Sequence, residues 1–172
     1  NVLMINVDEV FEEHGVDVSC YNLKCISKEK IPTRTNHQLV VGDLDSTLKA
    51  SINISLLNDE VFYPGNKKSL CWGSFYLDKS YDTLLSLLSK TKPLGLKGIL
   101  RFYDEIGKVY SIDVDVPKYE AFILSSKDQF DHFEAEDNML WYWFESKGTS
   151  EVQAYSVHTN TLSLVSSGEH NF

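Results

Sequence analysis

The chain has 172 residues with 42% apolar and 12% aromatic side chains, which is enough material for one globular domain with one core. Its formal net charge is −9, and residues 101–172 supply −8 of it through 13 acidic and 5 basic side chains. A negative potential repels phosphates and anionic headgroups, so we expect no direct binding to nucleic acid or to a membrane.

We expect a single domain over residues 1–172, located in the cytoplasm. No apolar run approaches the ~18 residues of a membrane-spanning helix, and the N-terminus lacks the pattern of a signal peptide. Met4 suits a natural start, which makes residues 1–3 a remnant, and residues 169–172 are expected to fray. The cysteines are odd in number and fit reduced core residues: Cys20, Cys25 and Cys71.

The first half of the chain reads as one short helix followed by strands. Residues 8–14 place acidic side chains around Val10 and Phe11 and precede Gly15, a pattern typical of an amphipathic helix with a glycine at its end. Alternation of apolar and polar residues, or a short apolar run, then predicts strands over residues 16–26, 39–42, 48–56, 61–63 and 70–77.

A long helix is predicted next, over Ser80–Thr91. Its leucines, at positions 84, 85, 87 and 88, fall on one broad helical face behind a Ser80 cap, and Pro93 follows its end. Beyond it, residues 98–105 and 108–116 predict a hairpin, and residues 120–124 predict a further strand. The chain then reads as a meander of three strands, over residues 139–145, 151–158 and 161–166.

These elements predict an α+β domain in which a predominantly antiparallel β-sheet packs on one long helix, with a short N-terminal helix beside it. The alternative is a β-sandwich or barrel in which the long helix forms a plug or lid. Strands do not alternate regularly with helices, which argues against a doubly wound parallel sheet and its nucleotide sites.

The sequence contains no glycine-rich phosphate loop, dinucleotide fingerprint, nucleophile elbow or histidine pair with zinc-ligand spacing. We therefore expect no cofactor, no metal and no catalytic residue, although a site assembled from scattered residues would escape such a search. The nearest candidate for chemistry is the pair Asp113 and Asp115, which share one face of a predicted strand, as in metal-dependent hydrolases. The simpler interpretation is that Val114 and its neighbours fill the core while both aspartates face water.

The segment 128–137 combines five acidic side chains with two phenylalanines and no basic residue. One interpretation is a docking segment in which the phenyl rings enter a pocket and the carboxylates meet basic side chains of a partner. The other is a solvated acidic turn whose phenyl rings belong to the core. The candidate partner-binding residues are Asp128, Phe130, Asp131, Phe133, Glu134, Glu136 and Asp137.

The run Trp141-Tyr142-Trp143-Phe144 places aromatic side chains on both faces of one strand. Burial on both sides is the simpler interpretation, because large aromatic side chains usually fill a sheet core. The alternative is an exposed platform, with Trp141 and Trp143 on one side, that binds a sugar or a protein.

We expect a non-enzymatic acidic binding protein that neutralises a basic protein partner, such as an immunity protein or inhibitor of a nuclease toxin. This hypothesis rests on the small size, the missing catalytic motifs and the concentration of acidic residues after residue 100. The alternatives are a metal-dependent hydrolase that uses Asp113 and Asp115, and a carbohydrate-binding module that uses the aromatic strand.

Overall fold

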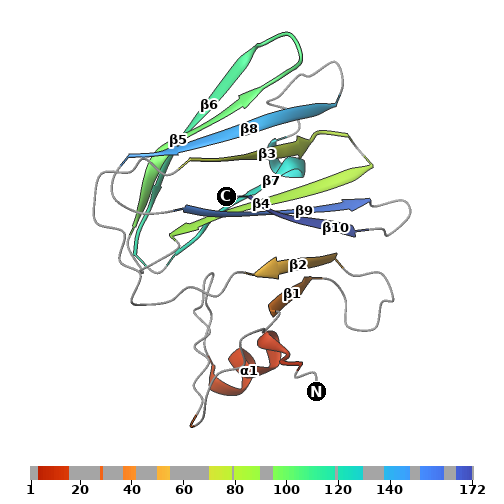
Figure 1. Ribbon diagram of the computed structural model, residues 1–172, viewed down its shortest axis with the longest axis vertical. Helices are drawn as coiled ribbons and strands as arrows, with labels where there is room; N and C mark the ends of the chain where they lie inside the picture. The colour runs from red at the N-terminus through yellow and green to blue at the C-terminus, as the bar shows by residue number, and fades with distance from the viewer. Residues whose placement is uncertain are drawn as a thin grey trace.

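The computed structural model describes residues 4–15, 28, 37–41, 50–54, 70–78, 80–89, 95–118, 120–129, 138–147, 152–160 and 166–171. Within them, two four-stranded antiparallel sheets lie face to face (Figure 1). One sheet has the strand order β10-β9-β4-β7 and consists of β10 (Ser166–Asn171), β9 (Val152–Asn160), β4 (Tyr81–Ser89) and β7 (Phe122–Ser125). The other has the order β3-β8-β5-β6 and consists of β3 (Leu70–Tyr76), β8 (Met139–Ser146), β5 (Leu96–Tyr103) and β6 (Val109–Val116).

The remaining described elements are small. Strands β1 (His37–Val41) and β2 (Ala50–Ile54) form an antiparallel pair, and β2 lies next to β10. Helix α1 (Val7–His14) contains no buried residue, and helix α2 (Ser126–Gln129) directly follows β7. Neither helix has the length and apolar character that crossing a membrane would require.

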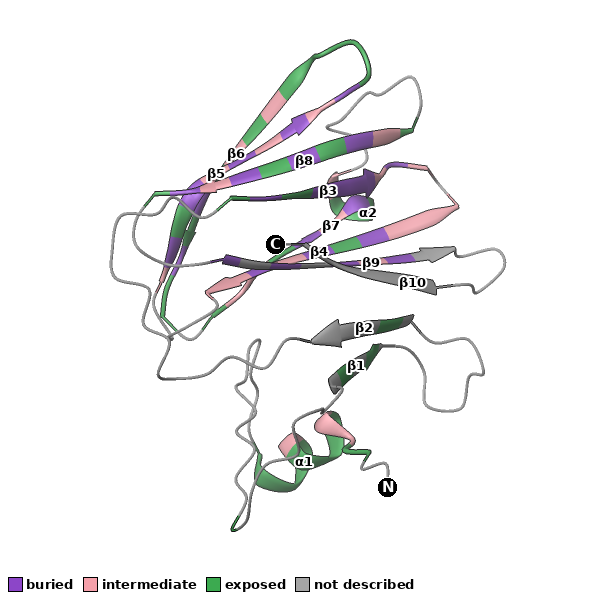
Figure 2. Cartoon of the chain, viewed as in Figure 1, coloured by how far each residue is buried: buried purple, intermediate pink, exposed green. Residues whose placement is uncertain are grey.

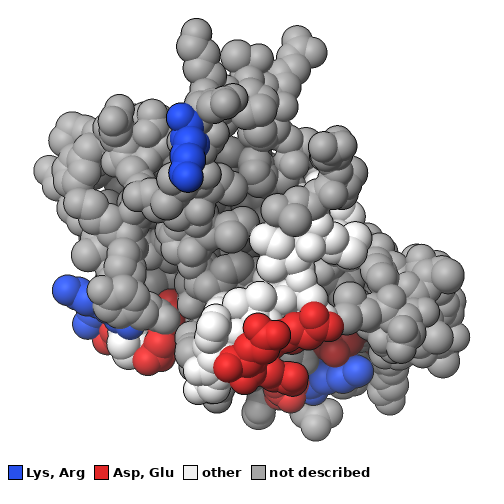
Figure 3. All heavy atoms as spheres, turned by 90° about the horizontal axis from the view of Figure 1, so that it is seen from below, with Lys and Arg blue, Asp and Glu red and all other residues white. Residues whose placement is uncertain are grey.

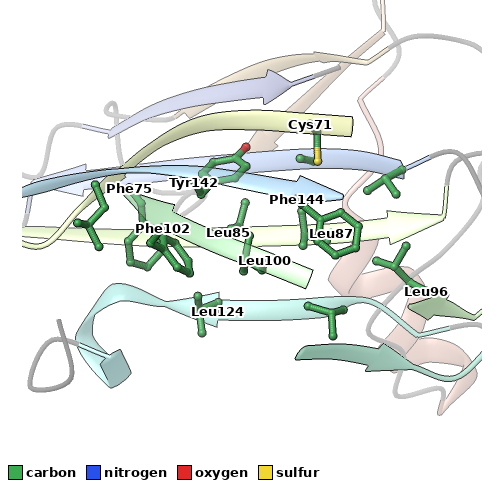
Figure 4. Packing of buried hydrophobic residues seen from close by; sticks show 14 of the residues in the cluster. Cys71, Phe75, Leu85, Leu87, Leu96, Leu100, Phe102, Leu124, Tyr142 and Phe144 are labelled. Atoms are coloured by element: carbon green, nitrogen blue, oxygen red, sulfur yellow. The ribbon is translucent and has the colours of Figure 1, made fainter. Parts of the chain in front are cut away.

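The core lies between the two four-stranded sheets, because each contributes its inward-facing side chains to one cluster. Figure 4 shows Leu85 and Leu87 of β4 among side chains of the opposite sheet, including Leu100 and Phe144. The complete buried cluster is Cys71, Phe75, Leu77, Leu85, Leu87, Leu96, Leu100, Phe102, Val114, Val116, Leu124, Leu140, Tyr142, Phe144, Val152 and Ala154. The architecture is therefore a β-sandwich with an aromatic and aliphatic filling.

The predicted long helix over Ser80–Thr91 is wrong, because these residues form strand β4. Adjacent leucine pairs satisfy a helical period and a strand period equally well, so the sequence pattern alone does not separate them. In the strand, Thr83, Leu85 and Leu87 face the core and Leu84 is exposed. Hydrogen-bonded pairing with β7 on one side and β9 on the other decides the conformation.

The predicted α+β fold is wrong for the same reason, since no long helix packs on a sheet within the described residues. The antiparallel sheets are confirmed. The alternative prediction is a β-sandwich or barrel with a helical plug. Its two packed sheets are present, whereas the helical plug is absent from the described part of the chain.

Several shorter predictions are confirmed. The N-terminal helix is α1, and it ends at Gly15, which adopts a left-handed conformation with φ 61°. The hairpin of residues 98–105 and 108–116 is β5 and β6, joined by a turn in which Gly107 has φ 83°. In that turn the Asp104 carboxylate accepts a hydrogen bond from the backbone N–H of Lys108 at 2.6 Å.

The predicted C-terminal meander is wrong in its connectivity. Strand β8 belongs to one sheet, and β9 pairs with β10 in the other, so the chain crosses between the sheets after residue 147. The third strand lies over Ser166–Asn171, which includes most of the residues expected to fray. The strands predicted over residues 16–26 and 61–63 lie outside the described residues.

The two sheets are joined at a corner between β3 and β4. The side chain of Ser80 and its backbone N–H both donate hydrogen bonds to the Asp78 carboxylate, and these bonds lower the pKa of that carboxyl. The backbone N–H of Tyr76 donates to the Thr83 hydroxyl at 3.1 Å, which ties the end of β3 to β4. The corner therefore holds the end of β3 next to the start of β4.

Close approach of strands β5 and β8 requires a glycine at position 98. A Cβ atom placed on Gly98 would lie 2.5 Å from the carbonyl oxygen of Glu145 and 2.5 Å from Cζ of Phe144. The Phe144 ring therefore packs directly over the glycine backbone. A larger residue at position 98 would displace the Phe144 ring and the Glu145 carbonyl group.

We predict that Gly98→Ala lowers the free energy of unfolding by about 1–3 kcal/mol, because the added methyl group overpacks this contact. Urea unfolding followed by circular dichroism measures the change. Ser111→Ala, an exposed position on neighbouring β6, is the matched control and should change stability by less than ~0.5 kcal/mol. Equal unfolding midpoints for wild type and Gly98→Ala would show that the ring does not lie over this backbone.

Candidate binding face

Strand β8 divides its aromatic side chains between the core and the solvent. Tyr142 and Phe144 are 1% and 0% exposed, whereas Trp141 and Trp143 are 49% and 41% exposed. Figure 2 shows the resulting alternation of purple and green along β8. Successive side chains of a strand point to opposite faces of the sheet, so filling the core with Tyr142 and Phe144 turns both tryptophans outward. The interpretation that both sides are buried is therefore wrong for the tryptophans.

Strand β3 adds a third tryptophan to the same outer face. Trp72 lies directly opposite Trp143 in the antiparallel register and is 57% exposed. The chain contains three tryptophans, so all of them lie exposed on one side of one sheet. We call the outer surface formed by Trp72, Trp141, Trp143 and the half-buried Tyr103 the aromatic face.

Strands β5 and β6 continue this surface with paired charges. Arg101 lies opposite Trp143 in the register, and its guanidinium is 3.6 Å from the carboxylate of Glu145. At the same end of the sheet, Lys97 Nζ lies 2.9 Å from the carboxylate of Asp115. The Lys97–Asp115 pair is open to solvent and contributes little to stability, whereas the Arg101 and Glu145 side chains are only 29% and 32% exposed.

The charge of this sheet surface is close to balanced, in contrast to the net −9 of the whole chain. Its outward charged side chains are Lys97, Arg101, Asp113, Asp115 and Glu145. Two cationic side chains and three carboxylates give this surface a net charge of −1. The aromatic face therefore combines a large apolar area with hydrogen-bonding groups and almost no net charge.

The candidate pair Asp113 and Asp115 lies where the alternation predicts. Both side chains are exposed on β6, and Val114 and Val116 are buried between and beside them. Asp115 is paired with Lys97. Within the described residues, no three His, Cys, Asp or Glu side chains come together in a way that could hold a metal. The structure therefore brings no third ligand to this pair from the described part of the chain.

The candidate docking segment is described only at its beginning. Asp128 lies in helix α2 and is exposed. The other candidates lie outside the described residues: Phe130, Asp131, Phe133, Glu134, Glu136 and Asp137.

One buried pair has the spacing of a nucleophile and its base. The Thr83 hydroxyl lies 3.0 Å from Nδ1 of His158, and the two residues are 0% and 2% exposed. The backbone N–H of Thr83 donates to the Ser126 hydroxyl at 2.8 Å, and the Tyr76 ring meets the His158 ring edge-on with centroids 4.8 Å apart. Burial of both groups argues against access by a substrate, and the cluster links strands β3, β4 and β9 with helix α2.

Sequence reasoning missed Trp72, Arg101 and Tyr103 as members of the site. Residues 70–77 read as one apolar strand, and that pattern does not show which side chains face the core. The register between β3 and β8 supplies this information by pairing Trp72 with Trp143. A period-two count that started from the buried Cys71 would have placed Trp72 outward.

Comparisons with protein-family models, with curated proteins and with solved structures find no match to this chain.

Cys71 is a further buried nucleophilic side chain of the described core, and burial raises the pKa of its thiol to about 12. We predict that in a Cys20→Ser/Cys25→Ser variant the native protein does not react with Ellman's reagent at pH 8. Unfolding in urea should release one reactive thiol per chain. Rapid reaction of the native variant would show that Cys71 is accessible and would reopen the possibility of cysteine chemistry.

Proposed function

We propose that this chain is a non-enzymatic binding module and that the aromatic face is its binding surface. The observation that carries the proposal is the exposure of all three tryptophans on the outer side of one sheet. Tryptophan is among the residues that contribute most to binding energy at interfaces, together with tyrosine and arginine, and Tyr103 and Arg101 lie beside it. A cluster of this composition supports a surface that a ligand covers.

The exposed area sets the strength of binding that these rings can support. Taking ~250 Å² for a fully accessible tryptophan, the three exposed fractions amount to about 350–400 Å². Covering that area contributes about 9 kcal/mol at ~25 cal/mol per Å², before any cost of association. The translational and rotational freedom lost on association, together with side-chain ordering, opposes this gain by roughly 4–15 kcal/mol. The tryptophans alone therefore support reversible rather than very tight binding.

Neutralisation of a basic protein, such as a nuclease toxin in the cytoplasm, is a second proposal that uses a different surface. Helix α1 carries exposed Asp8, Glu9, Glu12 and Glu13. Figure 3, seen from below, shows a group of acidic side chains on this side of the molecule. Asp128 is also exposed. The balanced charge of the aromatic face does not favour a basic partner there, so such a partner would bind elsewhere on the molecule.

A capture experiment with matched variants tests the first proposal. The immobilised wild-type chain, a Trp72→Ala/Trp141→Ala/Trp143→Ala variant and an Ile106→Ala/Ile123→Ala control are exposed to extract from the native source. Ile106 and Ile123 are exposed apolar residues outside the aromatic face. Retained proteins are quantified by mass spectrometry and retained sugars by composition analysis.

We predict at least one component that wild type and control retain equally and that the tryptophan variant retains at least tenfold less. Identical retention by all three proteins would contradict the aromatic face as a binding surface. A basic protein that the tryptophan variant still retains, and that elutes as salt rises, would support the second proposal instead.

A further inference from the structure

We infer that the ligand of the aromatic face is an uncharged glycan chain that lies flat on strands β3 and β8. This inference rests on the proposed function, because it names the chemical class that the same surface binds. Four observations support it: the exposed indole rings, their spacing, the charge balance around them and the area they present.

The chemistry of a sugar ring matches that of the surface. A pyranose ring presents C–H groups on its flat sides and hydroxyl groups around its rim. Its flat side can stack on an indole, whose electron-rich face attracts polarised C–H groups. Trp72, Trp141 and Trp143 each keep 41–57% of their surface accessible, which leaves area on each residue for contact with a sugar ring.

The spacing of the tryptophans suits successive rings of a chain. Trp72 and Trp143 are opposite each other on neighbouring strands, where side chains start about 5 Å apart. Trp141 and Trp143 are two residues apart on β8, which separates them by about 7 Å along the strand. An extended glycan can therefore meet more than one indole at a time, along or across the strands.

The charges beside the tryptophans suit a ligand that is polar but uncharged. Arg101 and Glu145 form a pair at 3.6 Å next to Trp143, and they offer hydrogen-bond donors and acceptors to hydroxyl groups. A ligand with phosphate, sulfate or carboxylate groups would meet the negative field of a chain with net charge −9. A strongly cationic ligand would find a net charge of only −1 on this surface and a stronger attraction at the acidic helix α1.

The accessible area argues against a second copy of the chain as the occupant. The tryptophans present about 350–400 Å², roughly half of the ~800 Å² that each partner contributes to a standard protein interface. Two such faces pressed together through their tryptophans alone would form a contact well below standard size. A ligand a few sugar rings long needs no larger area.

Intrinsic fluorescence tests the inference directly, because every tryptophan of the chain lies on this face. The full chain is titrated with soluble neutral glycans, namely a β-glucan, a xylan and a mannan, and with anionic alginate for comparison. Insoluble cellulose and chitin are tested by co-sedimentation. We predict that at least one neutral glycan shifts the emission to shorter wavelength in a saturable way, or sediments the chain, whereas alginate does neither.

Two variants make the result specific. Trp143→Ala, at the centre of the aromatic face, should weaken binding of the same glycan at least tenfold. Ile123→Ala, on the outer side of the other sheet, should leave the affinity within twofold of wild type.

Other results would contradict the glycan inference without contradicting the proposed binding surface. Absence of binding to every neutral glycan, or binding to alginate alone, contradicts an uncharged ligand. An emission shift that depends on the concentration of the chain itself, with doubled mass in analytical ultracentrifugation, identifies a second copy as the occupant. In that case, or if the capture experiment yields a protein that needs the tryptophans, the binding surface stands and the glycan is rejected.

Discussion

The inward packing of Tyr142 and Phe144 between the two sheets is the constraint on which the other features depend. Both side chains are buried, and Phe144 packs over Gly98 while the Tyr142 hydroxyl lies 3.5 Å from the hydroxyl of Ser156 in the opposite sheet. A strand has only two faces, so seating these rings in the core places Trp141 and Trp143 in solvent. The exposed aromatic surface is thus a direct consequence of the core.

The outer surface that results differs from the rest of the molecule in its charge. The chain carries −9, and its described helix α1 is strongly acidic, yet the outer side of the sheet β3-β8-β5-β6 pairs Arg101 with Glu145 and Lys97 with Asp115. Exposed tryptophans usually favour self-association, and a strong net charge of one sign opposes it. The molecule combines an exposed apolar surface with a repulsive charge elsewhere, which supports the proposal that this surface binds a different ligand rather than a second copy of the chain.

Much of the local structure followed from the sequence, and the assembly of its parts did not. The hairpin of β5 and β6 was predictable because alternation in both strands and the turn residues agree. Strand β4 was not, because the leucines at 84, 85, 87 and 88 fit either period and its pairing partners lie far away in the sequence. The two outward tryptophans of β8 were predicted as one alternative, but Trp72 joined them only through the register of β3 with β8. Register between distant strands depends on tertiary packing, which a single sequence does not display.

The division of the β8 side chains between core and solvent is tested most directly by two neighbouring substitutions, Trp143→Ala and Phe144→Ala, whose stabilities are measured by urea unfolding. Phe144→Ala should cost about 3–5 kcal/mol, because it leaves a cavity between the sheets. Trp143→Ala should cost about 1–2 kcal/mol, because a ring that is 41% exposed contributes much less to the core. An equal or larger loss for Trp143→Ala would mean that the indole is a core residue, and it would contradict both the aromatic face and the binding function built on it.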